Sequence, residues 1–378
     1  MPRAENVWRT WIVRGLALAV GFLAALLLLE VGLRVMPVHE GAHRLPVNEA
    51  NPVIRFESNR QFLWSRDWNF SLRNRVNVNN HGFVSDHDYD AAGTEPLLAV
   101  VGDSFIEAFM VPFPETCTGR LAALLQGHTR VYAFAVGGAP LSQYLAYAAY
   151  ARDTFHPDSL VVVVIGNDFD ESLRKYNHRP GYHYFVEGSQ GELELERTDF
   201  SVSLLKKVFR NSALALYLMH NLELGEAPSR LRRILNPDEE TAAGHAVAGA
   251  EASLVSDSKQ AVEQFLRMLP EFAGLEPEQI AFVVDGMRPQ LYDDKMVAEA
   301  RGSYIDVMRN YFMDMAREGG FEVVDLHPIF THDFKTHHQI FEYPQDAHWN
   351  ARGHRICFEE VARSTMLRNL IGFSPLQD

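Results

Sequence analysis

The stretch Leu97-Leu98-Ala99-Val100-Val101-Gly102-Asp103-Ser104-Phe105 decides the fold. It opens with an uninterrupted apolar run, typical of a strand covered on both faces, and continues into Gly-Asp-Ser, residue types that favour turns. Four further apolar runs follow, at Arg130 to Ala135, Leu160 to Ile165, Ile280 to Val284 and Phe321 to Val324. Because helical patterns separate these runs, the chain is predicted to be an α/β protein with a parallel five-stranded sheet.

Helices are predicted where apolar residues recur at every third or fourth position, at residues 117–126, 140–154, 256–271, 294–317 and 351–369. The chain between the third and fourth strands is too long for a simple crossover, so residues 170–255 are predicted to be an insertion with structure of its own. Within it we expect a hairpin at Tyr176 to Glu196, a helix at Ser203 to Leu224 and a mobile, small-residue segment at 242–252.

The N-terminal segment 1–37 is expected to be a transmembrane anchor. The uncharged apolar run from Gly15 to Leu29, with Trp8 and Trp11 before it, suits a bilayer core of about 30 Å. Several arginines precede this run, so the positive-inside rule places the N-terminus in the cytoplasm and the rest of the chain outside the cytoplasmic membrane, which is the periplasm in a Gram-negative bacterium. A cleaved signal peptide is the alternative, but no A-x-A site follows the leucines. Residues 38–95 read as a loop-rich linker that packs on a main domain at 96–378.

Composition excludes several classes of function. The 378 residues are 47% hydrophobic, which is enough for a packed core. The net charge is −14 and the chain has no cluster of basic residues, so nucleic-acid binding is not expected. Cys117 and Cys357 lack CxxC spacing, which excludes a disulfide framework. Four histidines near the fifth strand lack an HExxH pattern or cysteine partners, so no metal is predicted. These are His327, His332, His337 and His338. No cofactor is expected, because the chain has no nucleotide-binding motif.

Candidate catalytic groups follow the predicted strands. Ser104 comes after the first strand, Gly137-Gly138 after the second and Gly166-Asn167-Asp168 after the third. In parallel sheets the site forms beyond the carboxyl ends of the strands. Backbone N–H groups at the glycines and the Asn167 amide are suitable oxyanion donors, although all three motifs are also ordinary turn or cap signals.

A base for Ser104 is found near the C-terminus, in Asp346-Ala347-His348. A serine hydroxyl is a weak nucleophile unless an imidazole takes its proton. In a loop, residues two apart can place the carboxylate against one imidazole nitrogen while the other nitrogen faces the hydroxyl.

Four blocks of this sequence resemble, in their order and rough spacing, the conserved blocks of the SGNH (GDSL-like) hydrolases. They are Gly102-Asp103-Ser104-Phe105, Gly138, Gly166-Asn167-Asp168 and Asp346-x-His348. The resemblance implies a flavodoxin-like three-layer α/β/α sandwich with strand order 2-1-3-4-5. It also implies that Ser104 is nucleophile and oxyanion donor, that Gly138 and Asn167 complete the oxyanion hole, that His348 is the base and that Asp346 orients it. The second block keeps only the last glycine of the usual Asn-x-Gly-x-x-Gly, so Gly137 stays a rival donor.

The short Asp-x-His spacing and the leading span resemble membrane-anchored bacterial members associated with envelope polysaccharide acetylation. In such a fold Cys117 and Cys357 lie on helices that share one face of the sheet, which leaves a disulfide open. Arg288, after the fourth strand, is expected to face the crevice and contact an anionic or sugar substrate, or else to be a solvated loop residue.

The function expected is therefore a serine esterase that acts on an ester substrate, an O-acylated carbohydrate, outside the membrane. One alternative is an O-acetyltransferase that receives its acyl group from a multispanning membrane partner. A second is a carbohydrate-binding or scaffold protein without turnover.

Overall fold

The computed structural model describes residues 3–189, 191–224 and 248–372. The chain forms two compact units. The first contains Met1–Ala42, Phe62–Arg75 and Ser203–Leu231, and the second contains His43–Gln61, Val76–Val202 and Arg232–Asp378. The domain boundaries expected at residues 37 and 95 stay predictions. Most of the small-residue segment 242–252 lies outside the described residues.

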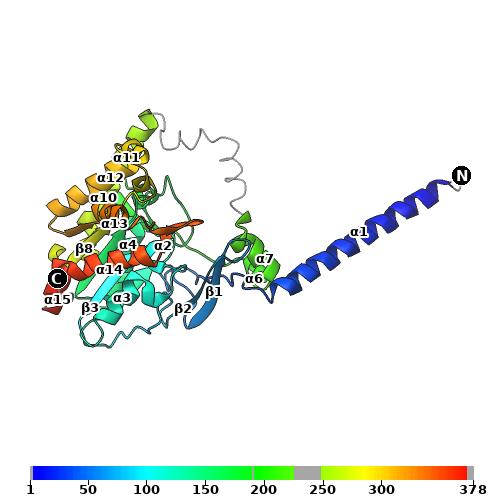
Figure 1. The fold of residues 1–378 in the computed structure, drawn as a ribbon, viewed down its shortest axis with the longest axis horizontal. Coiled ribbons are helices and arrows are strands. Elements are labelled where there is room, and N and C mark those ends of the chain that lie inside the picture. Colours follow the sequence, from blue (N-terminus) through cyan, green and yellow to red (C-terminus); the bar gives the residue numbers. More distant parts are fainter. Residues whose placement is uncertain (1–2, 190, 225–247, 373–378) are drawn as a thin grey trace. The chain divides into compact units, whose positions relative to one another are not determined.

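The second unit is built on a parallel sheet with the strand order β4-β3-β5-β8-β9 (Figure 1). Its strands are β3 (Leu97–Gly102), β4 (Arg130–Ala135), β5 (Ser159–Val164), β8 (Ile280–Val284) and β9 (Glu322–Asp325). Counted along the chain, this is the order 2-1-3-4-5, so the predicted sheet is confirmed. The strand bounds agree with the predicted ones to within one residue. Such agreement is expected of continuous apolar runs, because strands covered on both faces have no polar positions.

Helices cover both faces of this sheet. Leu98 and Val100 belong to the same buried cluster as residues of α3 (Cys117–Leu124), α13 (Leu326–His337), α14 (Ala351–Arg363) and α15 (Thr365–Ile371). On the other face, aromatic rings join the sheet to α4 (Leu141–Phe155), α10 (Ala248–Ala273) and α12 (Tyr304–Glu318). The three-layer α/β/α sandwich is therefore confirmed. Cys117 and Cys357 are buried free thiols whose Sγ atoms are 3.0 Å apart.

Two predicted helices are wrong because each is interrupted by a serine cap. The helix expected at 294–317 is divided into α11 (Asp294–Ala300) and α12, with Gly302 at φ +75° and the Ser303 hydroxyl accepting the N–H of Asp306. The helix expected at 351–369 is divided into α14 and α15, where the Ser364 hydroxyl accepts the N–H of Leu367. Serine favours helix N-caps, and the apolar pattern runs through both breaks without a visible change.

The insertion contains the predicted hairpin, as β6 (His183–Glu187) and β7 (Leu193–Arg197). The single helix expected at Ser203 to Leu224 is wrong. The segment is divided into α6 (Leu204–Phe209), α7 (Ala213–Leu216) and a π-helical turn, Tyr217–Asn221. The cause is again a serine, because Ser212 caps α7 by accepting the N–H of Ala215 at 3.1 Å.

The first unit contains α1 (Arg3–Leu33), α6 and α7. Residues Trp8–Leu33 of α1 are long and apolar enough to cross a membrane, and none of them is buried. The strands β1 (Arg60–Arg66) and β2 (Leu72–Val78) form a two-stranded sheet within the segment expected to be loop-rich. The prediction missed this sheet because its strands mix buried residues with Arg, Asn and Ser.

Short elements complete the chain. They are α2 (Ser104–Glu107), α5 (Asp168–Glu171), β10 (Glu342–Tyr343), β11 (Asp346–Trp349) and the 3-10 turns Phe113–Glu115, Pro277–Gln279 and Pro289–Tyr292.

Candidate active site

Ser104 lies at the point where β3 passes directly into α2. Gly102 permits this sharp join, because a Cβ there would come within 2.6 Å of the Ile106 side chain. Asp103 caps α2 by accepting the N–H of Phe105 at 2.9 Å. Burial raises the pKa of the Asp103 carboxyl to about 6, against the lowering effect of that hydrogen bond. The strand end thus presents a half-buried Ser104 at the carboxyl edge of the sheet.

The structure brings Ser104, His348 and Asp346 together. The Ser104 Oγ lies 2.7 Å from the His348 Nε2, and the opposite ring nitrogen, Nδ1, is hydrogen-bonded to the Asp346 carboxylate. The Asp346 side chain is 1% exposed and that of His348 is 26% exposed. A carboxylate shielded from water therefore holds one side of the imidazole, and the other side faces the hydroxyl.

Arg288 holds β11, the short strand that contains His348. Its guanidinium donates to the carbonyl of Ala347 at 2.9 Å and forms an ion pair with Asp285 at 2.9 Å. Asp285 also accepts the indole N–H of Trp349 at 3.0 Å, so both neighbours of His348 are fixed to one buried pair. The expectation that Arg288 contacts substrate or solvent is wrong, because Asp285 and Ala347 engage a side chain that is only 5% exposed.

The peptide group of Gly137 is held from both sides. Its N–H donates to the Glu107 carboxylate at 2.9 Å, and its carbonyl accepts from Arg44 at 3.1 Å and from the Tyr182 hydroxyl at 2.6 Å. Gly138 follows at φ +84°, a conformation that glycine adopts at little cost. Within the described part of the chain, no acceptor is recorded for the N–H of Gly138.

Asn167 is exposed at the end of β5, the strand next to β3. The turn beneath it is fixed by buried Asp168, which accepts the N–H of Ile165 at 2.8 Å and the hydroxyl of Tyr144 at 2.9 Å. Burial and the nearby charge of Asp103 raise the pKa of Asp168 well above its usual range. The Asn167 side chain hydrogen-bonds Glu171.

Sequence reasoning missed the groups that support this site, chiefly Glu107, Arg44, Tyr182 and Asp285. Glu107 lies one helical turn after Ser104 among apolar residues, and that context is a signal of a buried carboxyl. Arg44 comes from the segment expected to be a linker, where no sequence pattern marked it.

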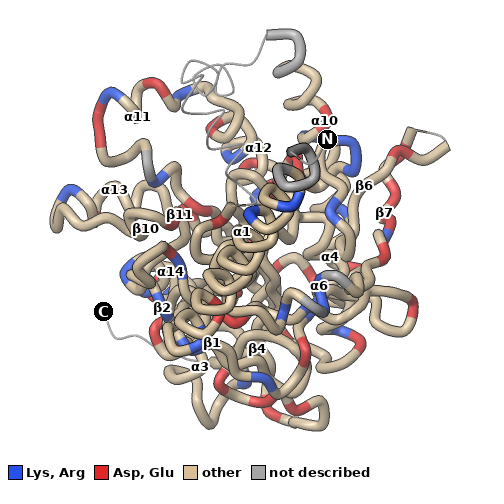
Figure 2. The backbone as a smooth tube through the Cα atoms, turned by 90° about the vertical axis from the view of Figure 1, so that its right-hand side faces the viewer, with Lys and Arg blue, Asp and Glu red and all other residues tan. Residues whose placement is uncertain are grey.

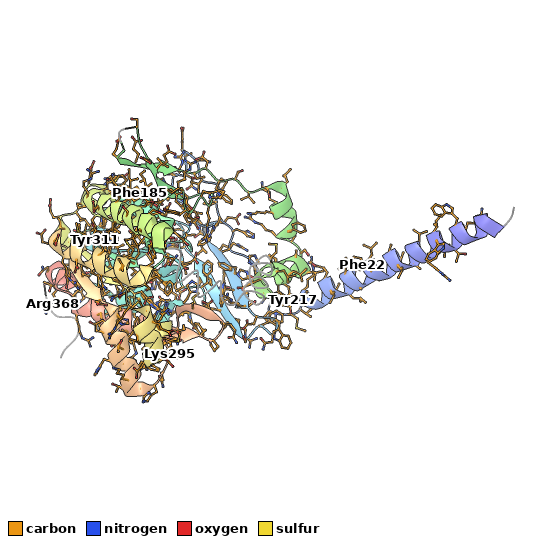
Figure 3. The ribbon with its side chains drawn as sticks, turned by 90° about the horizontal axis from the view of Figure 1, so that it is seen from above. Phe22, Phe185, Tyr217, Lys295, Tyr311 and Arg368 are labelled. Carbon is orange, nitrogen blue, oxygen red and sulfur yellow. The ribbon has the colours of Figure 1, made fainter. Side chains whose placement is uncertain are left out.

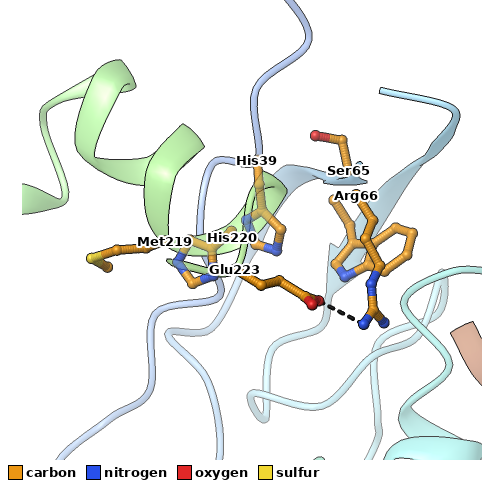
Figure 4. A pocket seen from close by; sticks show the side chains of 7 residues that line it. His39, Ser65, Arg66, Met219, His220 and Glu223 are labelled. Atoms are coloured by element: carbon orange, nitrogen blue, oxygen red, sulfur yellow. Dashed lines mark ion pairs between the residues drawn. The ribbon is translucent and has the colours of Figure 1, made fainter. Parts of the chain in front are cut away.

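A separate cavity of about 300 Å³ lies in the first unit (Figure 4). The imidazoles of His39 and His220 stack there with centroids 4.3 Å apart, and Arg66 pairs with Glu223 at 2.6 Å. Burial lowers the pKa of His220, and none of Ser104, His348 and Asp346 lines this cavity. Across the described residues, no group of three or more His, Cys, Asp or Glu side chains is arranged to hold a metal ion, and the predicted absence of a metal stays a prediction.

Several solved structures resemble the chain at low similarity. A catalytic mutant of the acetylxylan esterase Axe2 from Geobacillus stearothermophilus is 11% identical, with a TM-score of 0.40, 76% of this chain covered and 100% of that one. The lipase Lip_vut3 from a goat rumen metagenome is also 11% identical, with a TM-score of 0.39 and 74% and 100% covered. A lipolytic G-D-S-L family protein from Veillonella parvula is 11% identical, with a TM-score of 0.37 and 71% and 97% covered.

The family assignment comes from the sequence model of the GDSL-like lipase/acylhydrolases, which matches residues 98–361. No curated protein matches the chain. The matched range includes Ser104, Gly138, Asn167, Asp346 and His348, so it covers all the blocks on which the resemblance was based. The chain is therefore an acyl-ester hydrolase that belongs to the GDSL-like lipase/acylhydrolase family.

Proposed function

We propose that the protein is a membrane-anchored serine esterase that removes acyl groups, chiefly acetyl groups, from a carbohydrate outside the cytoplasmic membrane. The observation that carries the proposal is the hydrogen-bonded series from Ser104 Oγ through the imidazole of His348 to Asp346. This is the arrangement that turns a serine hydroxyl into a nucleophile.

In this mechanism the Ser104 Oγ attacks the ester carbonyl while the His348 Nε2 takes the hydroxyl proton. The negative charge that develops on the carbonyl oxygen is stabilised by the backbone N–H groups of Ser104 and Gly138 and by the Asn167 amide. His348 then protonates the departing alcohol, and water, deprotonated by the same imidazole, releases the acyl group from Ser104. Asp346 fixes the tautomer of the imidazole and stabilises its cationic form.

The proposed location rests on α1. The middle of this helix carries no charged residue (Figure 2), and its apolar side chains, Phe22 among them, project outward (Figure 3). Arginines at positions 3, 9 and 14 favour a cytoplasmic N-terminus by the positive-inside rule. The part of the chain that follows α1 would then lie on the outer side of the membrane.

The test is the turnover of p-nitrophenyl acetate by the full-length chain in detergent micelles. We expect Ser104→Ala and His348→Ala each to lower kcat by about 10⁴-fold or more, with the circular dichroism spectrum and the melting temperature close to those of the wild-type chain. Retained turnover in either folded variant would contradict the assignment of the nucleophile or the base.

The same residues can pass the acyl group to a sugar hydroxyl in place of water, which is the transferase alternative. The partly exposed imidazole of His348 can deprotonate either acceptor. Adding an oligosaccharide acceptor to the esterase assay separates the two reactions. A hydrolase forms free acetate at an unchanged rate, whereas a transferase forms acetylated sugar and consumes the ester faster. A folded chain with neither activity would support the binding or scaffold alternative.

A further inference from the structure

In the first unit, α7 is hydrogen-bonded to the end of α1. The Glu30 carboxylate accepts the hydroxyl of Ser212 and the N–H of Leu214, each at 2.9 Å, and the N–H of Ala213 at 3.1 Å. N–H groups in the first turn of a helix have no partner within the helix. Glu30 therefore acts as a cap for α7 that comes from another helix.

Arg34 reinforces the same connection. Its guanidinium donates to the carbonyl of Asn211 at 3.0 Å and to the Glu30 carboxylate at 2.8 Å. If α1 were cleaved off as a signal sequence, the first N–H groups of α7 would lose their acceptor. These contacts therefore favour a permanent anchor over a cleaved signal sequence, because the folded first unit uses α1.

Glu30 lies in the last turn of the apolar segment Trp8–Leu33. From Trp11 to Glu30 the helix is about 29 Å long at about 1.5 Å per residue, close to the thickness of a bilayer core of about 30 Å. With Trp11 at one interface, Glu30 and Arg34 reach the other. Because α7 is bonded to Glu30, α7 and the adjoining α6 are held at that interface as well.

The side chains around α6 suit this position. Leu204 is 81% exposed and Phe209 is 41% exposed, and the exposed Lys206 and Lys207 lie between them. Trp68, 71% exposed, belongs to the turn between β1 and β2, and its carbonyl accepts the Tyr217 hydroxyl at 2.9 Å, just beyond α7. Exposed large apolar residues beside lysines are the composition of segments that lie in the headgroup region of a bilayer.

We propose that α6 and Trp68 form an interfacial surface that lies on the anionic headgroups of the bilayer that α1 spans. Leu204, Phe209 and Trp68 enter the boundary between headgroups and acyl chains, and the positive charges of Lys206 and Lys207 attract α6 to the lipid phosphates. The inference goes beyond the esterase reaction and rests on the proposed membrane anchoring. Its consequence is that the first unit is fixed to the membrane by two contacts, a spanning helix and a surface segment.

Nitroxide accessibility tests the surface in the full-length chain. Single cysteines, Leu204→Cys and Phe209→Cys, are spin-labelled after reconstitution in vesicles of phosphatidylcholine and phosphatidylglycerol. Collision rates are measured with oxygen, which enters lipid, and with a water-soluble nickel chelate. Phe22→Cys on α1 is the lipid control, and Lys295→Cys on α11, where the lysine is 83% exposed, is the aqueous control. Because Cys117 and Cys357 are buried, the unsubstituted chain serves as the blank for labelling.

We expect the ratio of oxygen to nickel collisions at both α6 positions to exceed that at Lys295→Cys by about tenfold. Lys206→Glu with Lys207→Glu, or omission of phosphatidylglycerol, should lower this ratio at least about threefold, and Lys206→Arg with Lys207→Arg should preserve it. A ratio equal to that at Lys295→Cys overturns the proposal. Protection from both reagents also overturns it, because a protein would then cover α6. If Phe22→Cys is open to nickel, the anchor itself is wrong, and that failure is distinguishable from the others.

Discussion

The carboxylate of Glu107 accepts a hydrogen bond from the backbone N–H of Gly137 at 2.9 Å. From the sequence, the backbone N–H of either Gly137 or Gly138 could be the oxyanion donor, and this hydrogen bond distinguishes between the two. An N–H that already donates to a buried carboxylate is poorly placed to stabilise an oxyanion, whereas the next N–H along the chain, that of Gly138, has no recorded acceptor among the described residues. We therefore expect Gly138 to be the donor and Glu107 to position it.

Glu107→Gln and Glu107→Met form a matched pair that tests this positioning. The carbonyl oxygen of glutamine can still accept the Gly137 N–H, whereas methionine cannot. We expect the methionine variant to lower kcat for p-nitrophenyl acetate by about 10- to 100-fold with KM little changed, because a misplaced oxyanion donor affects the transition state more than the bound ester. The glutamine variant should stay within about fivefold of the wild-type chain. Equal losses in the two variants would instead indicate that the negative charge of Glu107 is needed.

The free energy of unfolding should depend on pH because the carboxyl of Glu107 is buried. Burial raises the pKa of its carboxyl from 4.5 to about 7, so between these values the folded state binds a proton that the unfolded state has lost. The stabilisation is full below about pH 4.5 and is lost as the pH rises through about 7. The glutamine in Glu107→Gln does not titrate. The free energy of unfolding of this variant, relative to that of the wild-type chain, should therefore rise by about 3 kcal/mol between pH 4.5 and 7, with no further change at higher pH. Urea unfolding of both chains at a series of pH values measures the difference, and a difference that does not vary with pH would contradict the assignment.

The sheet and the proposed catalytic residues could be predicted because each is encoded locally. Continuous apolar runs mark buried strands whatever surrounds them. Ser104 and Asn167 directly follow strand ends, and His348 shortly precedes a helix, each in a short recognisable block. The residues that hold them could not be predicted in the same way. Arg44 reaches Gly137 across 93 positions of the chain, and Arg288 reaches Ala347 across 59. Such pairs depend on the tertiary fold, and one sequence carries no pattern that joins them.

The buried pair between Arg288 and Asp285 should be essential for the fold. Arg288→Met leaves the Asp285 carboxylate with its indole donor, Trp349, but without its counter-ion, and breaking a buried ion pair from one side typically costs about 3–5 kcal/mol. Asp285→Asn in the same chain removes the uncompensated charge and still accepts the Trp349 N–H. We therefore expect the double variant to recover part of the lost free energy of unfolding. Chemical denaturation of the wild-type chain, the two single variants and the double variant measures the coupling, and strict additivity would contradict it.

Arg179 should select among substrates. It is exposed, and its guanidinium lies 2.5 Å from the point that a Cβ on Gly138 would occupy. Burial raises the pKa of Glu171, the carboxyl that also hydrogen-bonds Asn167, and the nearby charge of Arg179 opposes this rise. A cation beside Gly138, a proposed oxyanion donor, favours esters that carry a carboxylate near the scissile bond. We expect Arg179→Gln to lower kcat/KM for such an ester by about fivefold, the effect of an exposed ion pair, and to leave a neutral ester of the same size nearly unchanged. Arg179→Lys should retain most of the preference. Equal losses for both esters would place the effect of Arg179 on the oxyanion itself rather than on the substituent of the substrate.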